Sequence, residues 1–144
     1  MEQDRVTEPQ QPRSEPSPAV LVVDDDEDSR RILMYGLGNA GYRVLFAENG
    51  AAAVELCQTI RPDVVIMDLA MPEMDGYTAT KALKGDGRTR DVPVIAWSAR
   101  VLNTDTAELR AAGFDEVLAK PALPAEVVEV VRRHVPVGGA ARAD

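Results

Sequence analysis

Short apolar runs recur along the chain, and each one stops at polar or turn-forming residues. The runs are four to six residues long and show no helical period, which is typical of strands buried on both faces of a parallel sheet. We therefore predict five strands, at residues 20–23, 42–47, 64–68, 92–97 and 114–119.

The segments between these runs carry apolar residues at helical spacing. They predict five helices, at residues 28–40, 51–60, 77–84, from Thr104 or Asp105 to Gly113, and 124–134. In the first helix we expect Asp28 or Ser29 as the N-cap, Gly41 as the stop, and a buried stripe of Ile32, Leu33, Leu37 and Ala40. Strands alternating with helices indicate right-handed crossovers and an α/β fold with helices on both faces of the sheet.

The two ends of the chain differ in composition from the middle. Residues 1–18 are rich in Pro, Gln, Glu and Ser and poor in large apolar side chains, so we expect a disordered leader. Residues 135–144 are rich in Gly and Ala, and we expect a flexible tail. One domain is thus predicted over residues 19–134.

Composition narrows the functional classes. The 144 residues carry a net charge of -8, which argues against direct binding to nucleic acid and favours a metal ion or a basic protein surface. The single cysteine, Cys57, excludes an intramolecular disulfide. The sequence shows neither a transmembrane-length apolar run nor a signal-peptide pattern, so we expect a cytoplasmic protein without membrane contact.

Polar residues stand where the predicted strands end. Asp24 and Asp25 follow the first strand, Asp68 ends the third, Ser98 follows the fourth and Lys120 the fifth. The carboxyl ends of parallel strands meet at one edge of the sheet, where open α/β sheets bind their ligands. We therefore expect these five side chains to lie close together.

Three carboxylates at one edge require a compensating positive charge, because two like charges at 4 Å cost about 4 kcal/mol at an effective dielectric of 20. Oxygen ligands without His or Cys suit Mg²⁺. Lys120 offers a second positive charge. A carboxylate held between the two cations, such as that of Asp68, is a plausible nucleophile toward phosphorus, and its product is an acyl phosphate.

Four motifs in this order carry a resemblance to a known family. They are residues 22–26 (VVDDD), residues 67–76 (MDLAMPEMDG), the pair Ser98-Ala99 and the pair Lys120-Pro121. With them the chain resembles a chemotaxis-type receiver domain of response regulators in two-component signalling, from about residue 19 to residue 134. The resemblance implies a flavodoxin-like, five-stranded parallel sheet in the order 2-1-3-4-5.

The resemblance also implies a role for each acidic position. Asp68 would be the phosphoacceptor, taking a phosphoryl group from a histidine kinase or a histidine phosphotransfer protein. Asp25 and the backbone carbonyl of Ala70 would bind Mg²⁺ together with Asp68. Asp24 would bind the ion directly or through water.

The remaining motif positions receive switch roles from the same resemblance. Ser98 would hydrogen-bond the phosphoryl group, Lys120 would pair with it, and the Lys120-Pro121 peptide would be cis. Most receivers carry a switch aromatic three residues before the lysine, and here that position is Val117. This departure puts the usual aromatic switch in question.

The leading hypothesis is a stand-alone response regulator that signals through protein contacts of its fourth helix, fifth strand and fifth helix, roughly residues 104–133. The output would be a downstream protein or self-association. A receiver-like module that is never phosphorylated is the main alternative, and a phosphoryl shuttle also remains open. A small Mg²⁺-dependent phosphatase is disfavoured because Ala70 stands where a general acid is wanted. We therefore expect no enzyme beyond self-phosphorylation and self-dephosphorylation.

Overall fold

Strands and helices alternate along the chain in the computed structural model, which describes residues 17–71, 74–99 and 106–137. The strands are β1 (Ala19–Val23), β2 (Arg43–Ala47), β3 (Val64–Asp68), β4 (Val94–Ser98) and β5 (Glu116–Ala119). The helices are α1 (Glu27–Asn39), α2 (Gly50–Ile60), α3 (Gly76–Lys84), α4 (Thr106–Ala112) and α5 (Pro124–His134). Within the described ranges, no helix is long and apolar enough to span a membrane.

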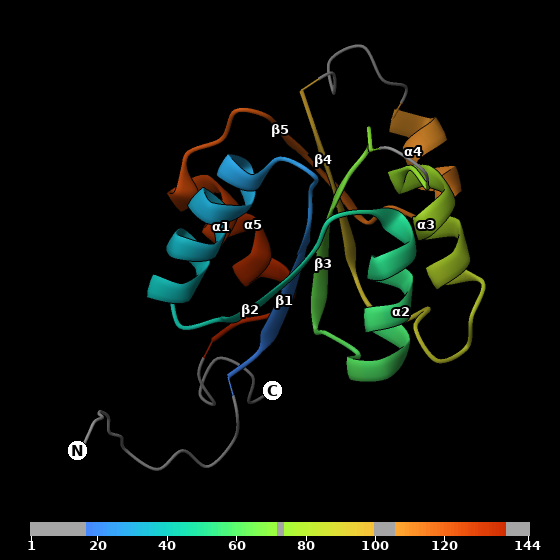
Figure 1. The fold of residues 1–144 in the computed structure, drawn as a ribbon, viewed down its shortest axis with the longest axis horizontal. Coiled ribbons are helices and arrows are strands. Elements are labelled where there is room, and N and C mark those ends of the chain that lie inside the picture. Colours follow the sequence, from blue (N-terminus) through green and yellow to red (C-terminus); the bar gives the residue numbers. More distant parts are fainter. Residues whose placement is uncertain (1–16, 72–73, 100–105, 138–144) are drawn as a thin grey trace.

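The five strands form one parallel sheet in the order β2-β1-β3-β4-β5. β1, β3 and β4 are buried along their whole length, as continuous apolar runs in a parallel sheet require. The predicted fold class and strand order are therefore confirmed. Figure 1 shows the strands running upward, so that their carboxyl ends meet at the top of the view.

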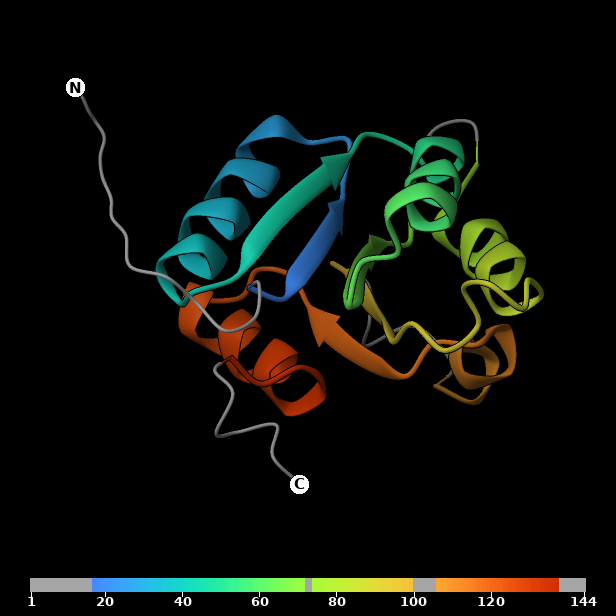
Figure 2. The same ribbon diagram turned by 90° about the horizontal axis from the view of Figure 1, so that it is seen from below.

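Helices cover both faces of the sheet, with α1 and α5 on one side and α2, α3 and α4 on the other (Figures 1 and 2). Side chains along each strand alternate between two apolar clusters. The α1–α5 side receives Val20, Val22, Val64, Ile66, Ile95 and Leu118. The α2–α4 side receives Leu21, Val23, Val65, Met67, Val94 and Ala96.

The first helix begins earlier than predicted. Its N-cap is Asp26, whose side chain accepts a hydrogen bond from the Ser29 N–H at 3.1 Å, so the prediction of Asp28 or Ser29 was wrong. The Asp24 carboxylate accepts the N–H of Asp26 and turns the chain into the helix at this point. The predicted stop is confirmed, since Gly41 follows the helix with φ +104°, a conformation that favours glycine.

The predicted buried stripe of α1 is partly wrong. Leu33 and Leu37 are buried, as expected, but Ile32 is 54% exposed and Ala40 is half-buried. Leu33 and Leu37 are four residues apart and lie on one line of the helix surface, whereas Ile32 is turned away by about 100°. The helix contacts the sheet and α5 along this narrow line, so Ile32 faces outward.

The packed part of the chain continues past α5. Val135 is buried, and its carbonyl accepts a 2.6 Å hydrogen bond from the Tyr42 hydroxyl, while Val137 packs against the α1–α5 cluster. These residues fall in the segment that we expected to be a tail. Residues 138–144, residues 1–16 of the expected leader, and the expected starts at Thr104 or Asp105 lie outside the described residues.

Candidate functional site

Three charged side chains from three strands meet at the carboxyl edge of the sheet. Asp24 follows β1, Asp68 is the last residue of β3, and Lys120 follows β5. By strand alternation all three belong to the set that faces α1 and α5. The sheet order brings β1 and β3 side by side, while Lys120 reaches across β4.

Lys120 bridges the two buried carboxylates. Its Nζ lies 3.1 Å from Asp24 Oδ2 and 3.2 Å from Asp68 Oδ2. Burial alone works against the charged amine, but the hydrogen bonds and charges of Asp24 and Asp68 outweigh it and raise the pKa of Lys120 above its ordinary value. The ammonium is therefore a fixed positive charge in the site at neutral pH.

Asp68 is 5% exposed, and its environment shifts its titration. Burial raises the pKa of Asp68 to about 6, while the Ala70 N–H, which donates to Asp68 Oδ1 at 3.1 Å, and the Lys120 charge oppose the rise. Such a carboxylate is ionised at pH 7 but poorly solvated. A cation or an electrophile can thus reach a carboxylate that water stabilises only weakly.

Asp24 is fully buried and hydrogen-bonded at both oxygens. Its Oδ1 accepts the Asp26 N–H at 2.9 Å, and its Oδ2 accepts the Trp97 Nε1–H at 2.9 Å in addition to Lys120. Trp97 received no role in the site from the sequence analysis. Its hydrogen bond was missed, although Trp97 stands directly opposite Asp68 in the β3–β4 register.

Asp24, Asp25 and Asp68 could together hold a metal ion. One carboxylate oxygen from each lies within 4.8 Å of those of the other two. Asp25 is exposed, so the group opens to solvent on its side while the other two acids are buried. The ligand atoms are all oxygen, which fits a hard divalent cation such as Mg²⁺ and disfavours zinc or copper.

Ser98 and Val117 belong to the alternation set opposite to that of Asp68, but Ser98 ends β4 at the same carboxyl edge of the sheet. Ser98 is the buried last residue of β4, and its carbonyl accepts the Lys120 N–H at 2.9 Å. Alternation along β4 places Ser98 with Val94 and Ala96, the set that faces α2–α4. Val117, opposite Ala96 in β5, is half-buried on that side. The Lys120-Pro121 peptide bond is cis.

The loop after Asp68 returns tightly to the strand end. Gly76 donates its N–H to the Leu69 carbonyl at 3.3 Å, and a Cβ on Gly76 would collide with the Asp68 carbonyl oxygen. Asp75 caps α3 by accepting the Thr78 N–H at 2.9 Å. The Asp75-Gly76 pair therefore acts in the turn, and only glycine allows the close approach. Pro72 and Glu73 lie outside the described residues.

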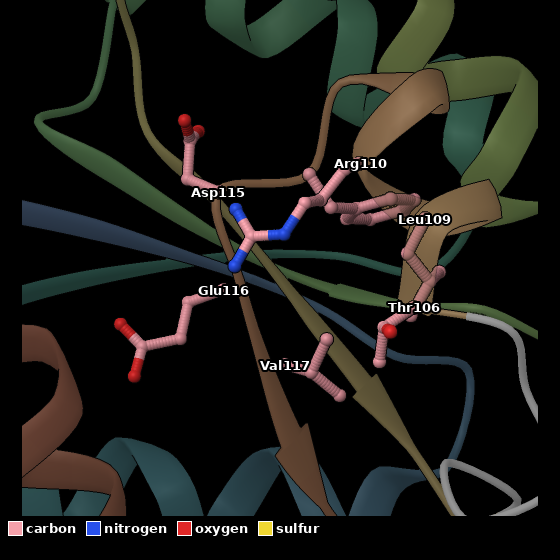
Figure 3. A pocket seen from close by; sticks show the side chains of 7 residues that line it. Thr106, Leu109, Arg110, Asp115, Glu116 and Val117 are labelled. Atoms are coloured by element: carbon pink, nitrogen blue, oxygen red, sulfur yellow. The ribbon is translucent and has the colours of Figure 1, made fainter.

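A surface pocket of about 400 Å³ lies between α4 and β5, lined by Thr106, Leu109, Arg110, Phe114, Asp115, Glu116 and Val117. Figure 3 shows Arg110 extending from α4 across the pocket toward β5, with Val117 of β5 below it in the view. Glu116, at the start of β5, also contacts Arg133 and His134 of α5 at 2.6 and 2.7 Å. The pocket is thus continuous with the α5 surface through Glu116.

Comparison with known families identifies this arrangement. The family model described as the response regulator receiver domain matches residues 20–132. The chain belongs to the response regulator receiver domain family. The matched range includes every candidate site residue of this receiver, from Asp24 to Lys120.

Two curated relatives illustrate different organisations of the family. DivK, the polar-differentiation response regulator of Brucella anthropi, is 30% identical over 117 residues, which cover 81% of this receiver and 95% of DivK. PrrA, a transcriptional regulatory protein of Mycobacterium tuberculosis, is 40% identical over 116 residues. That match covers 81% of this receiver but only 49% of PrrA, so the receiver spans about half the length of PrrA.

Solved structures with the same fold include two informative receivers. The chemotaxis response regulator CheY4 of Vibrio cholerae matches with a TM-score of 0.78 and 29% identity, over 83% of this chain and 99% of that one. The receiver domain of a sensor histidine kinase from Pseudomonas aeruginosa matches with a TM-score of 0.76 and 32% identity, over 82% and 97%. The latter structure holds a magnesium ion in its active site cleft.

Proposed function

We propose that this receiver accepts a phosphoryl group on Asp68 from the phosphohistidine of a histidine kinase or of a histidine phosphotransfer protein in the cytoplasm. The observation that carries the proposal is the position of Asp68. Its carboxylate is buried, its Oδ2 lies 3.2 Å from the Lys120 ammonium, and it shares an oxygen cluster with Asp24 and Asp25.

The proposed reaction uses the Asp68 carboxylate as the nucleophile. One Asp68 oxygen attacks phosphorus, the P–N bond of the phosphohistidine breaks, and the electron pair leaves with the imidazole. The product is an acyl phosphate on Asp68. The Lys120 ammonium is placed to stabilise the negative charge of the transferred group, and the Ser98 hydroxyl would hydrogen-bond it after transfer.

The residues of the site also fit Mg²⁺. In our proposal Asp25, Asp68 and the backbone carbonyl of Ala70 hold the ion, and Asp24 contributes directly or through water. A bound Mg²⁺ supplies positive charge to the phosphoryl oxygens in the transition state. The magnesium-bound receiver from the Pseudomonas sensor kinase supports this assignment.

The output proposed for this receiver is a protein contact through the surface of α4, β5 and α5. The pocket beside Val117 and the charged side chains at its rim, Arg110 and Glu116, support it (Figure 3). DivK, which the match covers almost completely, supports output by the receiver itself rather than by an attached domain. The net charge of -8 supports a protein partner or self-association rather than nucleic acid.

Intact mass spectrometry after incubation with acetyl phosphate and Mg²⁺ tests the acceptor. We expect a single phosphoryl adduct on the wild-type chain and its complete loss in Asp68→Asn and in the presence of a chelator. Asp115→Asn is the matched control, because Asp115 also contacts a lysine ammonium, that of Lys84 at 3.1 Å, outside the site. The control variant is expected to form the adduct as the wild type does.

Two results would reject the acceptor assignment. An adduct that persists in Asp68→Asn would place the phosphoryl group on another residue. Absence of any adduct in the wild type at short reaction times, with Mg²⁺ binding demonstrated, would favour the unphosphorylated interaction module.

Amide hydrogen exchange then tests the output surface, where we expect changes in β5 and α5 on phosphorylation of the wild type and none in Asp68→Asn.

A further inference from the structure

Trp97 touches both charges of an ion pair inside the site. Its Nε1–H donates to Asp24 Oδ2 at 2.9 Å, and the Lys120 Nζ lies 5.4 Å from the centroid of its ring. The same Lys120 Nζ lies 3.1 Å from the same Asp24 oxygen. The indole edge therefore holds the anion while its face lies within cation–π distance of the ammonium.

These contacts determine which part of the Asp24 carboxylate faces the cluster. A carboxylate oxygen has two lone pairs, and both lone pairs of Asp24 Oδ2 are taken, by Trp97 and by Lys120. Oδ1 accepts one hydrogen bond, from the Asp26 N–H, and keeps one lone pair. With respect to the residues that the structure describes, Asp24 thus has a single acceptor position left, on Oδ1, for a cation or a water bound to it.

The indole itself is held firmly in place. Trp97 is 4% exposed and belongs to the apolar cluster beneath α1 and α5, and its backbone lies in β4 between β3 and β5. Its carbonyl accepts the Leu69 N–H at 3.2 Å. A buried indole N–H needs a hydrogen-bond partner, so the core packing that fixes the ring also fixes the direction of the bond to Asp24.

We infer that Trp97 is a positioning residue of the divalent-cation site, which holds Asp24 in the orientation that the cation requires. The inference rests on the proposed function, because that proposal places Mg²⁺ beside Asp24. Groups that hydrogen-bond metal ligands typically contribute 10- to 100-fold to metal affinity. Trp97 acts through Asp24 and has no contact of its own with the reacting atoms in this assignment.

Titration calorimetry with Mg²⁺ on the full chain tests the inference. Trp97→Phe keeps an aromatic ring and removes the N–H donor, and we expect its Mg²⁺ affinity to fall by about tenfold or more. Tyr42→Phe is the matched control, because it removes a buried hydrogen bond on the same face of the sheet, to the Val135 carbonyl at 2.6 Å, away from the site. Its Mg²⁺ affinity is expected to equal that of the wild type.

A double-mutant cycle separates positioning from general loss of stability. If Trp97 acts through Asp24, then Trp97→Phe weakens Mg²⁺ binding in the wild-type background but not in an Asp24→Asn background. Equal weakening in both backgrounds would overturn the inference, since the effect would then bypass Asp24. So would an unchanged affinity in Trp97→Phe.

The wild-type chain provides a test that needs no variant. The indole Nε1–H resonance of Trp97, followed by ¹⁵N–¹H NMR, should shift on addition of Mg²⁺ because the carboxylate that it bonds would share its charge with the ion. A resonance that stays fixed while calorimetry shows Mg²⁺ bound would overturn the inference about Trp97 but would leave the proposed function intact. Absence of Mg²⁺ binding by the wild type would instead reject the proposed function, and the inference with it.

Discussion

Two lysines of this receiver sit in clusters with aspartates, and the clusters differ in how their charges are matched. The edge cluster comprises Asp24, Asp25, Asp68 and Lys120. The Lys84 cluster comprises Lys84 and Asp115, near the amino ends of β4 and β5. Both lysine side chains are 21% exposed, so burial does not distinguish them.

The Lys84 cluster is balanced. Its ammonium lies 3.1 Å from Asp115 Oδ2 and donates to the carbonyls of Val92 and Arg90 at 2.9 and 3.2 Å. Asp115 Oδ2 also accepts the Val94 N–H at 2.9 Å. One positive and one negative charge are thus paired, and their remaining hydrogen-bonding capacity ties α3 to the start of β4.

The edge cluster holds an excess of negative charge. In the part of the chain that the structure describes, ion pairs to its three carboxylates come from Lys120 alone. A matched lysine–aspartate contact therefore stabilises the fold, whereas surplus charge at a buried site marks a place for a ligand. A divalent cation would bring the edge cluster to balance.

The largest expected effect comes from removing each lysine in turn. Lys120→Met leaves the buried carboxylates of Asp24 and Asp68 without their cation and should lower the free energy of unfolding by about 3 to 5 kcal/mol without metal. Lys84→Met breaks a partly exposed contact and should cost about 1 to 3 kcal/mol. Urea unfolding with and without Mg²⁺ measures both.

Magnesium separates the two variants. Mg²⁺ should stabilise Lys120→Met more than it stabilises the wild type, because removal of the neighbouring ammonium strengthens attraction for a cation. Lys84→Met should respond to Mg²⁺ as the wild type does. Equal responses of the two variants would contradict the distinction between the clusters.

A smaller effect follows from the raised pKa of Asp68. The unfolded chain has the ordinary pKa of 3.8 and the folded chain about 6, so the free energy of unfolding falls as pH rises from about 4 through 6. The amide of Asp68→Asn does not ionise, so the variant does not lose stability in this way as the pH rises. Without metal, the variant should be more stable than the wild type at pH 7.5 by about 1 to 3 kcal/mol.

Urea unfolding of the metal-free chains across this pH range checks the sign. The advantage of Asp68→Asn should shrink as the pH is lowered toward 4, because the folded wild-type carboxyl is then protonated and the unfolded one is increasingly protonated as well. Mg²⁺ should reduce the advantage at pH 7.5 by favouring the ionised carboxylate. A variant that is less stable than the wild type at pH 7.5 without metal would show that burial does not dominate at Asp68.

The smallest expected effect belongs to Asp115. Asp115→Asn keeps an oxygen that can accept from Lys84 or Val94 but removes the charge, so we expect a loss of about 1 kcal/mol. Mg²⁺ affinity, measured by calorimetry, should not change. A change in Mg²⁺ affinity would mean that the two clusters are coupled through β4 and β5.

Much of the site could be predicted from the sequence because it follows from strand periodicity. An apolar run of four or five residues ending in a carboxylate fixes both the strand and the edge at which its last side chain lies. Asp24, Asp68 and Lys120 meet for this reason. The same logic gave the strand positions to within about two residues, with β4 and β5 each starting two residues later than predicted.

Features that depend on lateral contacts could not be predicted in this way. The hydrogen bond from Trp97 to Asp24 joins β4 to β1 across β3, and no local pattern encodes the rotamer of an indole. The exposure of Ile32 depends on how wide a stripe of α1 the sheet and α5 cover. The choice of Asp26 as the helix cap among neighbouring acids depends on the Asp24 carboxylate behind it.

The position of Trp97 also has an optical consequence. The sequence contains a single tryptophan, and its indole lies against the carboxylate and the ammonium of the edge cluster. Light that excites tryptophan selectively over the three tyrosines therefore reports on this one place in the molecule. The unlabelled receiver carries its own fluorophore, and stopped-flow emission can follow events at the edge cluster in real time.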